Sequence, residues 1–552
     1  MCGRGKFDRV AEVFSPIDWR DYFFYVVHDM HNERSPLQRF LLPGLLAATV
    51  LVLYAPLAQF PFVQDDWVVL HDCMFRPAPT VIADMLNPLG KFFYRPLGGI
   101  YCWLVYAAFG LHPSGFHILA LLILIVTSFL VVSVAGNLTG DQNVAWGCGF
   151  MYAAASNIHI DAQMWLVGID DIAPGLLALL CIDSFIKKRY ARSALWFALA
   201  LGFKEGMAML FFVLCAWALL NGNDVPDGMP ALRKVLARLK WHCLALCAFG
   251  AAKLPGTSLF ALPLTHPYAA RLIGSHIGTN FQLFALAGLQ AVLPLKRVVF
   301  SESAALMTLF VATAALALVF IAGVTHFAGR NTKTRTALAI TVFILSWFFL
   351  MLFPPLTLEN HFSRYYLTAA LPPLIIGTML VVKLVLLNAG RGARFILIAT
   401  IAFTVANVID GGVSVYRRVG LGVQDGIHAS ARDGDNHFIR KASLVRETWK
   451  PLLGVLPAIP HGSLLVLEDV ETVCFADKYG VQVWYADSTL LVTSSVPSGP
   501  DSTGMIHATM AVEAPWNMPS TPPVICFPAS RTVYVRRTQD GMELARPGPA
   551  GG

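Results

Sequence analysis

The sequence predicts a polytopic α-helical membrane protein of about eleven transmembrane helices, followed by a small extracytoplasmic domain of α/β or β-rich fold. Three observations lead to this class. Hydrophobic residues make up 56% of the chain, charged residues only 14%, and the mean hydropathy is +0.60. Long apolar runs alternate with short basic loops. Near residue 410 the composition changes to charged sequence rich in Gly and Pro. One soluble core of this length does not require so much apolar sequence.

The transmembrane helices are predicted from apolar runs, since a spanning helix requires about 20 such residues. A polar segment, residues 1–39, precedes them and is expected in the cytoplasm. The long runs are Phe40–Ala58, Gly115–Gly136, Ala304–Val324, Ala337–Pro354, Leu367–Leu387 and Phe395–Val408. The shorter runs are Val144–Asn157, Ile172–Ile186, Ala194–Phe203, Gly206–Leu220 and Trp241–Leu254. Short helices are tolerated inside a bundle, where protein rather than lipid surrounds them.

Basic loops predict the topology, because short positively charged loops stay in the cytoplasm. Four clusters mark that side, at residues 187–192, 233–240, 330–335 and 391–394. An even number of crossings between the first two clusters places Lys204 and Glu205 outside, on the side of Asp65. The same parity makes Asn280–Leu295 an outer-surface or re-entrant helix. The C-terminus is then outside, and the first outer loop, at about residues 59–114, carries Leu97–Leu111 in the membrane interface.

The predicted domains are therefore a membrane domain over residues 40–410 and an outer domain over residues 411–552, which ends in a disordered tail. Short strand-like runs occur in the outer domain: Ser463–Leu467, Val481–Tyr485, Leu490–Thr493 and Thr532–Val535. Cys474 and Cys526 lie on an oxidising side, so a disulfide between them is one expectation and two unpaired thiols are the equal alternative.

The pair Asp65 and Asp66 is the first candidate for chemistry, because two adjacent carboxylates follow directly after the first apolar run. Such a pair can hold a divalent cation. Alternatively, like-charge repulsion raises the pKa of one member and makes it a general base near neutral pH. Mg²⁺ or Mn²⁺ is accordingly an open candidate cofactor.

Other polar residues are expected on the same outer face. Lys204 and Arg364 are able to bind an anionic leaving group such as phosphate. A base with a phosphate clamp indicates group transfer from a phosphate-linked donor. His159 and Asp161 are residue types that commonly bind metal ions, although a role in helix capping explains their spacing at least as well. Taken singly, each such residue is more often only a solvated group at a helix end.

These residues also carry a resemblance to a known family. The ordered motifs are Asp65-Asp66, Tyr94-Arg95-Pro96-Leu97, Phe109-Gly110, Phe116-His117, His159-Ile160-Asp161 with Trp165 and Gly168, and Phe203-Lys204-Glu205. Together they cover about residues 40–220, and Ser363-Arg364-Tyr365 resembles a later feature. The set resembles the GT-C superfamily of membrane glycosyltransferases, in particular the protein O-mannosyltransferase-like branch and its bacterial relatives.

The resemblance implies transfer of a sugar, with inversion, from a polyprenyl-phosphate carrier to a hydroxyl of a protein or envelope glycan. It implies a bacterial inner membrane with the site facing the periplasm. Asp65 would be the base, and Asp66 would orient it or hold a cation. Lys204, Arg364 and Arg95 would face the donor phosphate. The expected substrate or cation contacts are His159, Asp161, Glu205 and His117, with Asp65 and His159 as candidate metal ligands.

Two other functions compete with this interpretation. A transporter or flippase of lipid-linked saccharides would also require intramembrane polar groups, but its inverted repeats and broken helices are not evident in the sequence. A scaffold with a working outer domain requires only one anchoring helix. The expected partners are thus the lipid-linked donor, an acceptor and membrane lipid, and no nucleic-acid-binding module is present.

Overall fold

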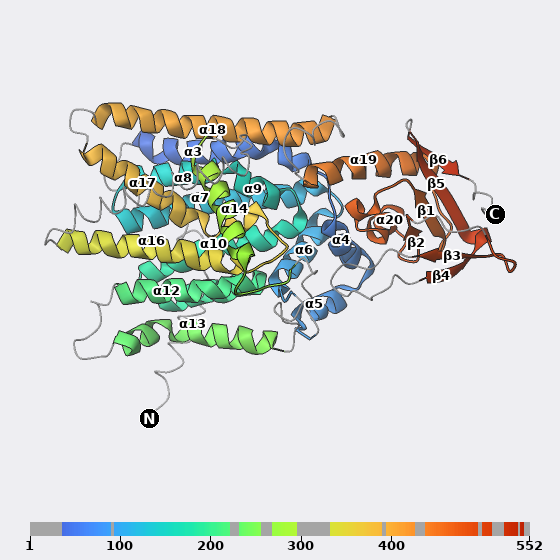
Figure 1. Ribbon diagram of the computed structural model, residues 1–552, viewed down its shortest axis with the longest axis horizontal. Coiled ribbons are helices and arrows are strands. Elements are labelled where there is room, and N and C mark those ends of the chain that lie inside the picture. Colours follow the sequence, from blue (N-terminus) through green and yellow to red (C-terminus); the bar gives the residue numbers. More distant parts are fainter. Residues whose placement is uncertain are drawn as a thin grey trace, which may run out of the picture.

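A bundle of long helices forms most of the molecule, and a smaller region containing all of the described strands lies at one end of it (Figure 1). The computed structural model describes residues 36–89, 93–220, 231–254, 268–294, 332–388, 393–424, 437–494, 500–509, 524–538 and 541–545. The expected span Ala304–Val324, the polar segment 1–39 up to residue 35, and the tail from residue 546 lie outside these ranges.

The first part of the chain contains the helices of the bundle and the helices of the first outer loop. They are α3 (Pro36–Tyr54), η2 (Ala55–Gln59), α4 (Asp65–Phe75), α5 (Ala78–Leu86), α6 (Pro96–Phe109), α7 (Pro113–Thr139), α8 (Gln142–Ala153), α9 (Ser156–Gln163), η3 (Leu166–Gly168), α10 (Ile169–Ile186), α11 (Tyr190–Phe203), η4 (Glu205–Ala208), α12 (Met209–Leu220) and α13 (Ala231–Lys253). The turn between α7 and α8 shows how local sequence sets these ends. Gly140 adopts a left-handed conformation after α7, and the Asp141 carboxylate caps the first amides of α8.

The second part of the chain completes the bundle and then forms the outer domain. Its elements are α14 (Ser275–Val292), α16 (Thr332–Leu356), η7 (Arg364–Leu367), α17 (Leu371–Asn388), α18 (Ala393–Gln424), α19 (His437–Val455), β1 (Leu464–Glu468), η9 (Thr472–Phe475), α20 (Lys478–Tyr485), β2 (Leu491–Thr493), β3 (Met505–Thr509), β4 (Val524–Pro528), η10 (Ala529–Arg531), β5 (Thr532–Thr538) and β6 (Gly541–Ala545). The composition change near residue 410 therefore falls inside the continuous helix α18.

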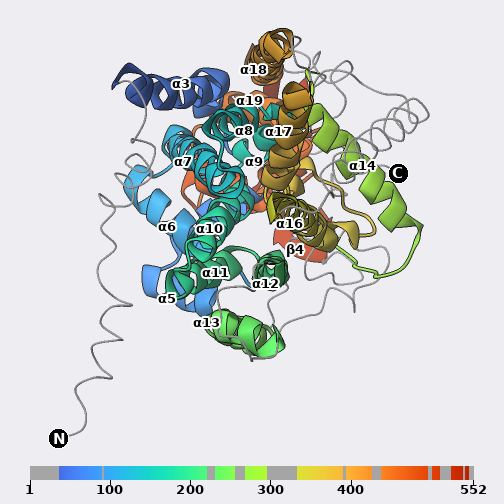
Figure 2. The same ribbon diagram turned by 90° about the vertical axis from the view of Figure 1, so that its left-hand side faces the viewer.

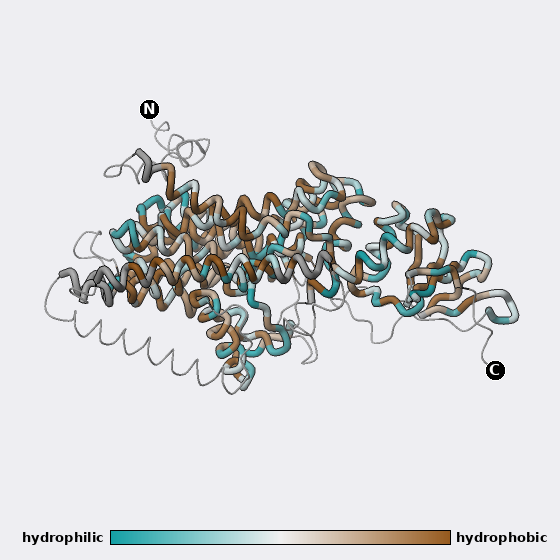
Figure 3. The backbone as a smooth tube through the Cα atoms, turned by 90° about the horizontal axis from the view of Figure 1, so that it is seen from above, coloured by the Kyte–Doolittle hydropathy of each residue, from teal (hydrophilic) through white to brown (hydrophobic). Residues whose placement is uncertain are grey.

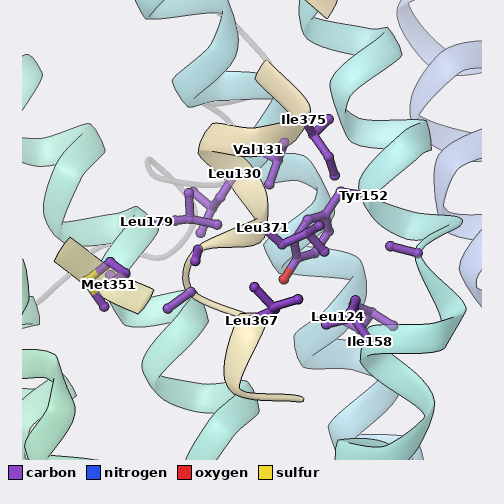
Figure 4. Packing of buried hydrophobic residues seen from close by; sticks show 14 of the residues in the cluster. Leu124, Leu130, Val131, Tyr152, Ile158, Leu179, Met351, Leu367, Leu371 and Ile375 are labelled. Atoms are coloured by element: carbon purple, nitrogen blue, oxygen red, sulfur yellow. The ribbon is translucent and has the colours of Figure 1, made fainter. Parts of the chain in front are cut away.

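One large apolar core fills the bundle. Seen along the helix axes, α7, α8, α10 and α17 lie near its centre, and α3, α13 and α14 lie at its edge (Figure 2). Residues from several of its elements meet in the close view of Figure 4, among them Val131 of α7, Tyr152 of α8, Leu179 of α10, Met351 of α16 and Leu371 of α17. Because the central helices are covered by other helices, they need not be long enough to face lipid over their whole length.

The protein is an integral membrane protein with a mostly helical fold. Among the described residues, four helical segments are long and apolar enough to cross a membrane: Phe40–Gln59, Pro113–Thr139, Arg233–Lys253 and Ala339–Leu356. Shorter apolar helices accompany them, and apolar residues predominate along the bundle (Figure 3). The expected number of about eleven spans is not confirmed by this criterion, because several helices of the bundle are shorter than a bilayer requires.

The outer domain contains a four-stranded mixed sheet in the order β2-β1-β5-β6 and a separate antiparallel pair, β3 and β4. Strand β1 is parallel to both β2 and β5, whereas β6 is antiparallel to β5. The expected strands at 463–467, 490–493 and 532–535 are confirmed as β1, β2 and β5. The expected strand Val481–Tyr485 is wrong, since these residues belong to helix α20.

The error over α20 has a physical reason. The alternation of Val481, Gln482 and Val483 suggested one buried and one solvated face. In the structure all three are buried, and the Gln482 amide donates to the carbonyls of Ser488 and Leu490 at 3.0 and 2.7 Å. A polar side chain that satisfies backbone groups in the interior is therefore compatible with a buried helical turn.

The expected disulfide is also absent, because both of its cysteines are free thiols. Cys474 is buried in η9, where its thiol donates to the Glu471 carbonyl at 2.7 Å. Cys526 lies exposed on β4, in the separate strand pair. The alternative of two unpaired thiols is the one that the structure supports.

Helix α4 joins the outer domain to the bundle through the indole of Trp67. This ring packs edge-on against Trp449 and Trp484, which are themselves stacked with a centroid distance of 5.6 Å. On the bundle side it contacts Phe62, which in turn packs against Phe116 at the start of α7. Aromatic pairs of this kind stabilise an interface beyond the area that they bury. The N-terminal end of α4 is thereby held where the two parts of the molecule meet.

Candidate active site

Asp66, at the start of α4, is buried and binds backbone N–H groups. Its side chain is 1% exposed, and one carboxylate oxygen accepts from Val63 N at 3.0 Å. The other oxygen accepts from Leu166 N and Val167 N at 2.8 and 3.4 Å. These bonds tie the first turn of α4 to η3. Burial raises the pKa of Asp66 to about 8, against the effect of the three backbone N–H groups, and neighbouring Asp65 raises it further.

Asp65 lies beside it but in a different environment. Its side chain is half-buried, and among the described residues none donates a hydrogen bond to its carboxylate. Burial raises the pKa of Asp65 above its ordinary range, whereas the positive charge of Lys441 lowers it. A carboxylate with spare acceptor capacity and a raised pKa is suited to receive a proton. The two adjacent aspartates therefore differ in environment, which sequence adjacency cannot reveal.

The residue before them has an unusual backbone. Gln64 has φ of 50° and ψ of −119°, a backbone conformation that residues other than glycine rarely adopt. The outer domain holds this conformation from two directions: Gln64 N donates to the Cys474 carbonyl at 2.8 Å, and Lys441 Nζ donates to Gln64 Oε1 at 2.5 Å. Residues of α19 and η9 thus fix the backbone immediately before Asp65 and thereby the orientation of the Asp65 side chain.

A cluster of charged side chains, here named the charge cluster, lies at the same end of the bundle. It consists of Arg95, Asp170, Asp171, Lys204 and Glu205. Arg95 Nε donates to Glu205 at 3.1 Å and Arg95 Nη1 to Asp170 at 3.4 Å, and Lys204 donates to Asp171. The loop before α6, the start of α10 and the α11–η4 turn therefore meet.

The cluster retains unused acceptor capacity. Among the described residues, Asp170 Oδ1 and Glu205 Oε1 are buried and have no hydrogen-bond partner. Asp170 is also packed tightly against α6, because a Cβ added at Gly98 would lie 1.9 Å from its Oδ1. Only glycine fits at position 98 without displacing this carboxylate. The cluster contains three carboxylates and two cations, so it is poised to accept a further positive group or to rearrange around an anion.

Tyr268 connects Asp65 with the charge cluster. Burial raises the pKa of the Tyr268 hydroxyl to about 12, and its charge also interacts with Asp65, Arg95 and Asp171. Its ring lies 5.0 Å from Phe93 and 4.6 Å from His361. The Tyr268 hydroxyl is thus within electrostatic reach of both Asp65 and the charge cluster.

A pocket opens beside Lys204. Its lining includes Asp171, Lys204, Met351, Pro354, Tyr365 and Tyr366. Lys204 Nζ lies 4.4 Å from the centre of the Tyr366 ring, in a cation–π contact. The pocket therefore combines one cation and one carboxylate with apolar and aromatic walls. This combination suits an amphipathic ligand with an anionic group.

Arg364 begins η7, directly before the two tyrosines of the pocket. It is half-buried, and among the described residues no ion pair with it is formed. Its expected role as a phosphate ligand stays a prediction. Asp161 is half-buried in α9, where it makes contacts of its own.

The two predicted histidines are buried among backbone groups. His117 contacts the Gln163 carbonyl through Nδ1 and the Phe60 carbonyl through Nε2, both at 2.9 Å. His159 contacts the Tyr152 carbonyl at 2.9 Å and packs on the ring of the same residue. Each histidine thus joins neighbouring segments of the bundle. Their expected contacts with substrate or cation stay predictions.

No group of three or more His, Cys, Asp or Glu side chains in the described ranges is arranged to hold a metal ion. The candidate ligands Asp65 and His159 belong to different environments, since His159 bonds within the α8–α9 corner. The carboxylates of the charge cluster have the right chemistry for Mg²⁺ or Mn²⁺, but Arg95 and Lys204 already occupy them in part. A divalent cofactor accordingly stays a prediction.

Sequence reasoning missed several residues of this region, in particular Gln64, Tyr268, Tyr366 and Lys441. The doublet Tyr365-Tyr366 after Arg364 was a usable signal, since adjacent aromatic residues beside a charge are typical of binding surfaces. Lys441 gave no signal, because it is one of several basic residues in an amphipathic helix and lies 377 positions from its partner Gln64. Only the docking of the outer domain brings it to the site.

The fold and the charge cluster define the class of protein: an integral membrane protein with a polar site. This site lies at the end of the helical bundle to which the outer domain is attached. No family model matches the sequence, and no curated protein matches it. Among solved structures, the chain is similar to ArnT from Cupriavidus metallidurans bound to undecaprenyl phosphate, with 10% identity and a TM-score of 0.47 over 83% of this chain and 86% of that one.

It is also similar to the oligosaccharyltransferase of Archaeoglobus fulgidus in complex with Zn and sulfate, with 12% identity and a TM-score of 0.43. That match covers 72% of this chain and 57% of the other, so the chain spans little more than half of the oligosaccharyltransferase. The same protein tethered to an acceptor peptide gives 15% identity and a TM-score of 0.39.

Proposed function

We propose that the protein is a membrane glycosyltransferase that moves a sugar from a polyprenyl-phosphate donor to an acceptor hydroxyl at the outer face of the membrane. One arrangement carries this proposal: carboxylates hold the cations Arg95 and Lys204, and Lys204 lines a pocket with apolar and aromatic walls. At the start of α4, Asp65 is a half-buried carboxylate to which none of the described residues donates a hydrogen bond. A proton acceptor and a clamp for an anionic leaving group are the two requirements of such a transfer.

In this reaction Asp65 takes the proton of the acceptor hydroxyl as the oxygen attacks the anomeric carbon of the sugar. The bond between that carbon and the phosphate oxygen breaks, and the polyprenyl phosphate leaves with the bonding electrons. Attack opposite the leaving group inverts the configuration at this carbon. Asp66 keeps α4 in place through its backbone bonds and so orients the base.

The cations stabilise the charge that develops on the leaving phosphate. Lys204 lies at the pocket and Arg95 lies in the charge cluster, and each is held by carboxylates that fix its position before substrate enters. We propose Arg364 as a third cation that turns toward the phosphate. The apolar wall formed by Met351 and Pro354 receives the first isoprenoid units.

The aromatic side chains around the site suit a sugar. Tyr268, His361 and Tyr366 form a continuous set of ring contacts, with centroid distances of 4.6 and 5.7 Å between neighbours. Aromatic rings cover the apolar faces of a sugar while leaving its hydroxyls to polar groups. The remaining polar residues at this end, Asp161 and Glu205, are proposed to contact those hydroxyls or a cation.

A transfer assay tests the proposal. Purified protein in lipid nanodiscs is given a panel of radiolabelled polyprenyl-phosphate sugars, and release of label from the lipid is measured. Asp65→Asn is expected to abolish release, and Lys204→Met to lower it on the order of 10²-fold. Asp72→Asn is the matched control, because Asp72 lies on the same helix, is 42% exposed and pairs with Arg76. It is expected to keep full activity.

Two outcomes would contradict the assignment. Equal turnover in Asp65→Asn and the parent protein would remove Asp65 as the base. Movement of intact lipid-linked sugar across the bilayer, without cleavage of the sugar–phosphate bond by any donor of the panel, would instead identify a flippase.

A further inference from the structure

A second group of reactive side chains lies in the outer domain, on the strand pair β3–β4. In this antiparallel pair His507 is directly opposite Cys526. Ile506 and Ala508 of β3 are buried against Leu464 and Tyr534 of the four-stranded sheet. Because side chains alternate along a strand, His507 and Cys526 project from the other, exposed face. The thiol and the imidazole are therefore neighbours on a surface open to solvent.

Three side chains on this face form a chain of hydrogen bonds. Cys526 Sγ lies 3.2 Å from His507 Nδ1, and His507 Nε2 lies 2.9 Å from Asp501 Oδ2. Nucleophile, base and orienting carboxylate are thus in the order that activates a thiol. The other cysteine of the domain, Cys474, instead donates a hydrogen bond from its thiol to the Glu471 carbonyl in the interior.

Asp501 is fixed independently of the histidine. Its Oδ1 accepts from Thr503 N, Thr503 Oγ1 and Met505 N at 2.8, 2.5 and 3.1 Å. The Thr503 hydroxyl, His507 and these amides hold the pKa of the Asp501 carboxyl well below its usual range. An ionised carboxylate accepts only, so His507 Nε2 must carry the proton and Nδ1 presents its lone pair to the thiol.

We propose that Cys526, His507 and Asp501 form a thiol-nucleophile site that undergoes exchange with small disulfides outside the membrane. In this step Cys526 gives its proton to His507 Nδ1, and the thiolate attacks one sulfur of the disulfide. A bond forms between Cys526 Sγ and that sulfur, the original S–S bond breaks, and the leaving thiolate takes the proton back from His507. No other oxidant is required, because one disulfide and one thiol are consumed and one disulfide and one thiol are formed.

The product is a stable mixed disulfide on the protein. Cys474 is buried in η9 and faces the Glu471 carbonyl, so it is not placed to resolve the adduct within the molecule. The site thus serves for covalent modification of the outer domain rather than for catalytic turnover of disulfides. Its location on β3 and β4 makes it independent of the proposed sugar transfer.

The test uses the full-length protein in detergent with oxidised glutathione as the probe. Formation of the adduct on the peptide containing Cys526 is followed by mass spectrometry over time and over a pH series. His507→Gln is expected to slow the reaction near neutral pH by about 10-fold and to shift its pH midpoint upward. Asp501→Asn is expected to slow it by a smaller factor, because the imidazole remains.

His461→Gln is the matched control. His461 is an exposed histidine of the same domain that pairs with Asp487 at 2.9 Å, but no cysteine adjoins this pair in the described residues. It is expected to leave the rate unchanged. Equal rates in the parent protein and in His507→Gln would overturn the proposal.

A second measurement uses only the parent protein and therefore does not require that a variant folds. The reaction of the native parent protein is compared with that of the same protein unfolded in urea, where the three side chains separate. Native Cys526 is expected to react faster near neutral pH than unfolded Cys526. A native rate equal to or below the unfolded rate would show that the arrangement does not activate the thiol.

Discussion

At the scale of single residues, the adjacent carboxylates Asp65 and Asp66 have different environments. The backbone of α4 turns one carboxylate into the interior, where the amides of Val63, Leu166 and Val167 bind it. The other carboxylate stays beside Lys441 and within reach of Tyr268. Helical geometry explains the difference, because consecutive residues of a helix project about 100° apart and do not share a face.

The first prediction concerns pH and stability at Asp66. Because burial raises its pKa to about 8, the folded protein keeps a proton that the unfolded chain releases at lower pH. The stabilising contribution is therefore fully present at acid pH and is lost as the pH rises through about 8. Asp66→Asn is expected to remove this fall and to lower the free energy of unfolding by about 1–3 kcal/mol, because the amide cannot accept all three N–H groups.

Thermal unfolding of the detergent-solubilised protein over a pH series measures this effect. Asp72→Asn serves as the comparison, because Asp72 lies on the same helix with a side chain that is 42% exposed, and it is expected to leave the melting temperature nearly unchanged. If the two variants behave alike, the structural role assigned to Asp66 is incorrect.

The second prediction concerns pH and activity. A base must be deprotonated, so transfer activity is expected to rise with pH along a limb that reports the raised pKa of Asp65. Lys441→Ala removes a positive charge that lowers this pKa, and the limb is expected to move to higher pH. Lys441→Arg retains the charge and is expected to restore the position of the limb.

Rate against pH for each variant gives the midpoints. Lys450→Ala is the control, because Lys450 is an exposed residue of the same helix. A limb that stays in place when Lys441 loses its charge would exclude an electrostatic influence of the outer domain on the base.

At the scale of elements, the close approach of α6 and α10 fixes the charge cluster. Gly98 in the first turn of α6 allows the Asp170 carboxylate to lie against the helix backbone. This contact holds Asp170 where Arg95 Nη1 reaches it. A local feature of two helices thereby determines the geometry of three charged side chains.

The third prediction follows from this contact. Gly98→Ala is expected to displace Asp170, to release Arg95, and to lower transfer activity by about 10 to 100-fold, since small misplacements of positioned groups cost this much. Kinetic measurements on the nanodisc preparation report kcat and KM separately. Gly250→Ala is the control, because a Cβ at that helical glycine meets no atom within 4 Å. Similar kinetics in the two variants would refute the role of position 98.

The sequence predicted most of the bundle at this scale. Apolar runs identified α3, α7, α10, α16 and α17 well, because their length and hydropathy are strong signals. The short run 481–485 was predicted wrongly, since a window of five residues does not distinguish a buried turn of helix from a strand. Ion pairs of Arg95 and Lys204 with Asp170, Asp171 and Glu205 could not be predicted, because they depend on how separate helices pack.

At the scale of the whole molecule, the loop that carries Arg95 and the turn that carries Lys204 lie at one end of the bundle. The opposite end of α10 carries Lys187, which pairs with Asp183 of the preceding turn. The basic turn after α10 and the charge cluster thus lie at opposite ends of the bundle. Which of these ends faces the cytoplasm stays a prediction. The number of crossings stays a prediction, since the bundle mixes long and short helices.

The fourth prediction concerns this polarity. In intact cells, a membrane-impermeant maleimide is expected to label Lys204→Cys and Asp72→Cys but not Lys188→Cys. The background lacks the exposed native cysteines Cys247 and Cys526. Labelling of all three after permeabilisation is the control. Labelling of positions 204 and 72 from opposite sides of the membrane would contradict the proposed site.

The strained backbone of Gln64 has a consequence for the biogenesis of the protein. Its conformation depends on Lys441 and Cys474, which leave the ribosome long after the helices of the bundle. A nascent chain that has inserted α3 to α18 still lacks the contacts that hold the loop before Asp65. The end of the membrane domain that carries Asp65 is therefore complete only when the domain that contains Lys441 and Cys474 has folded onto it.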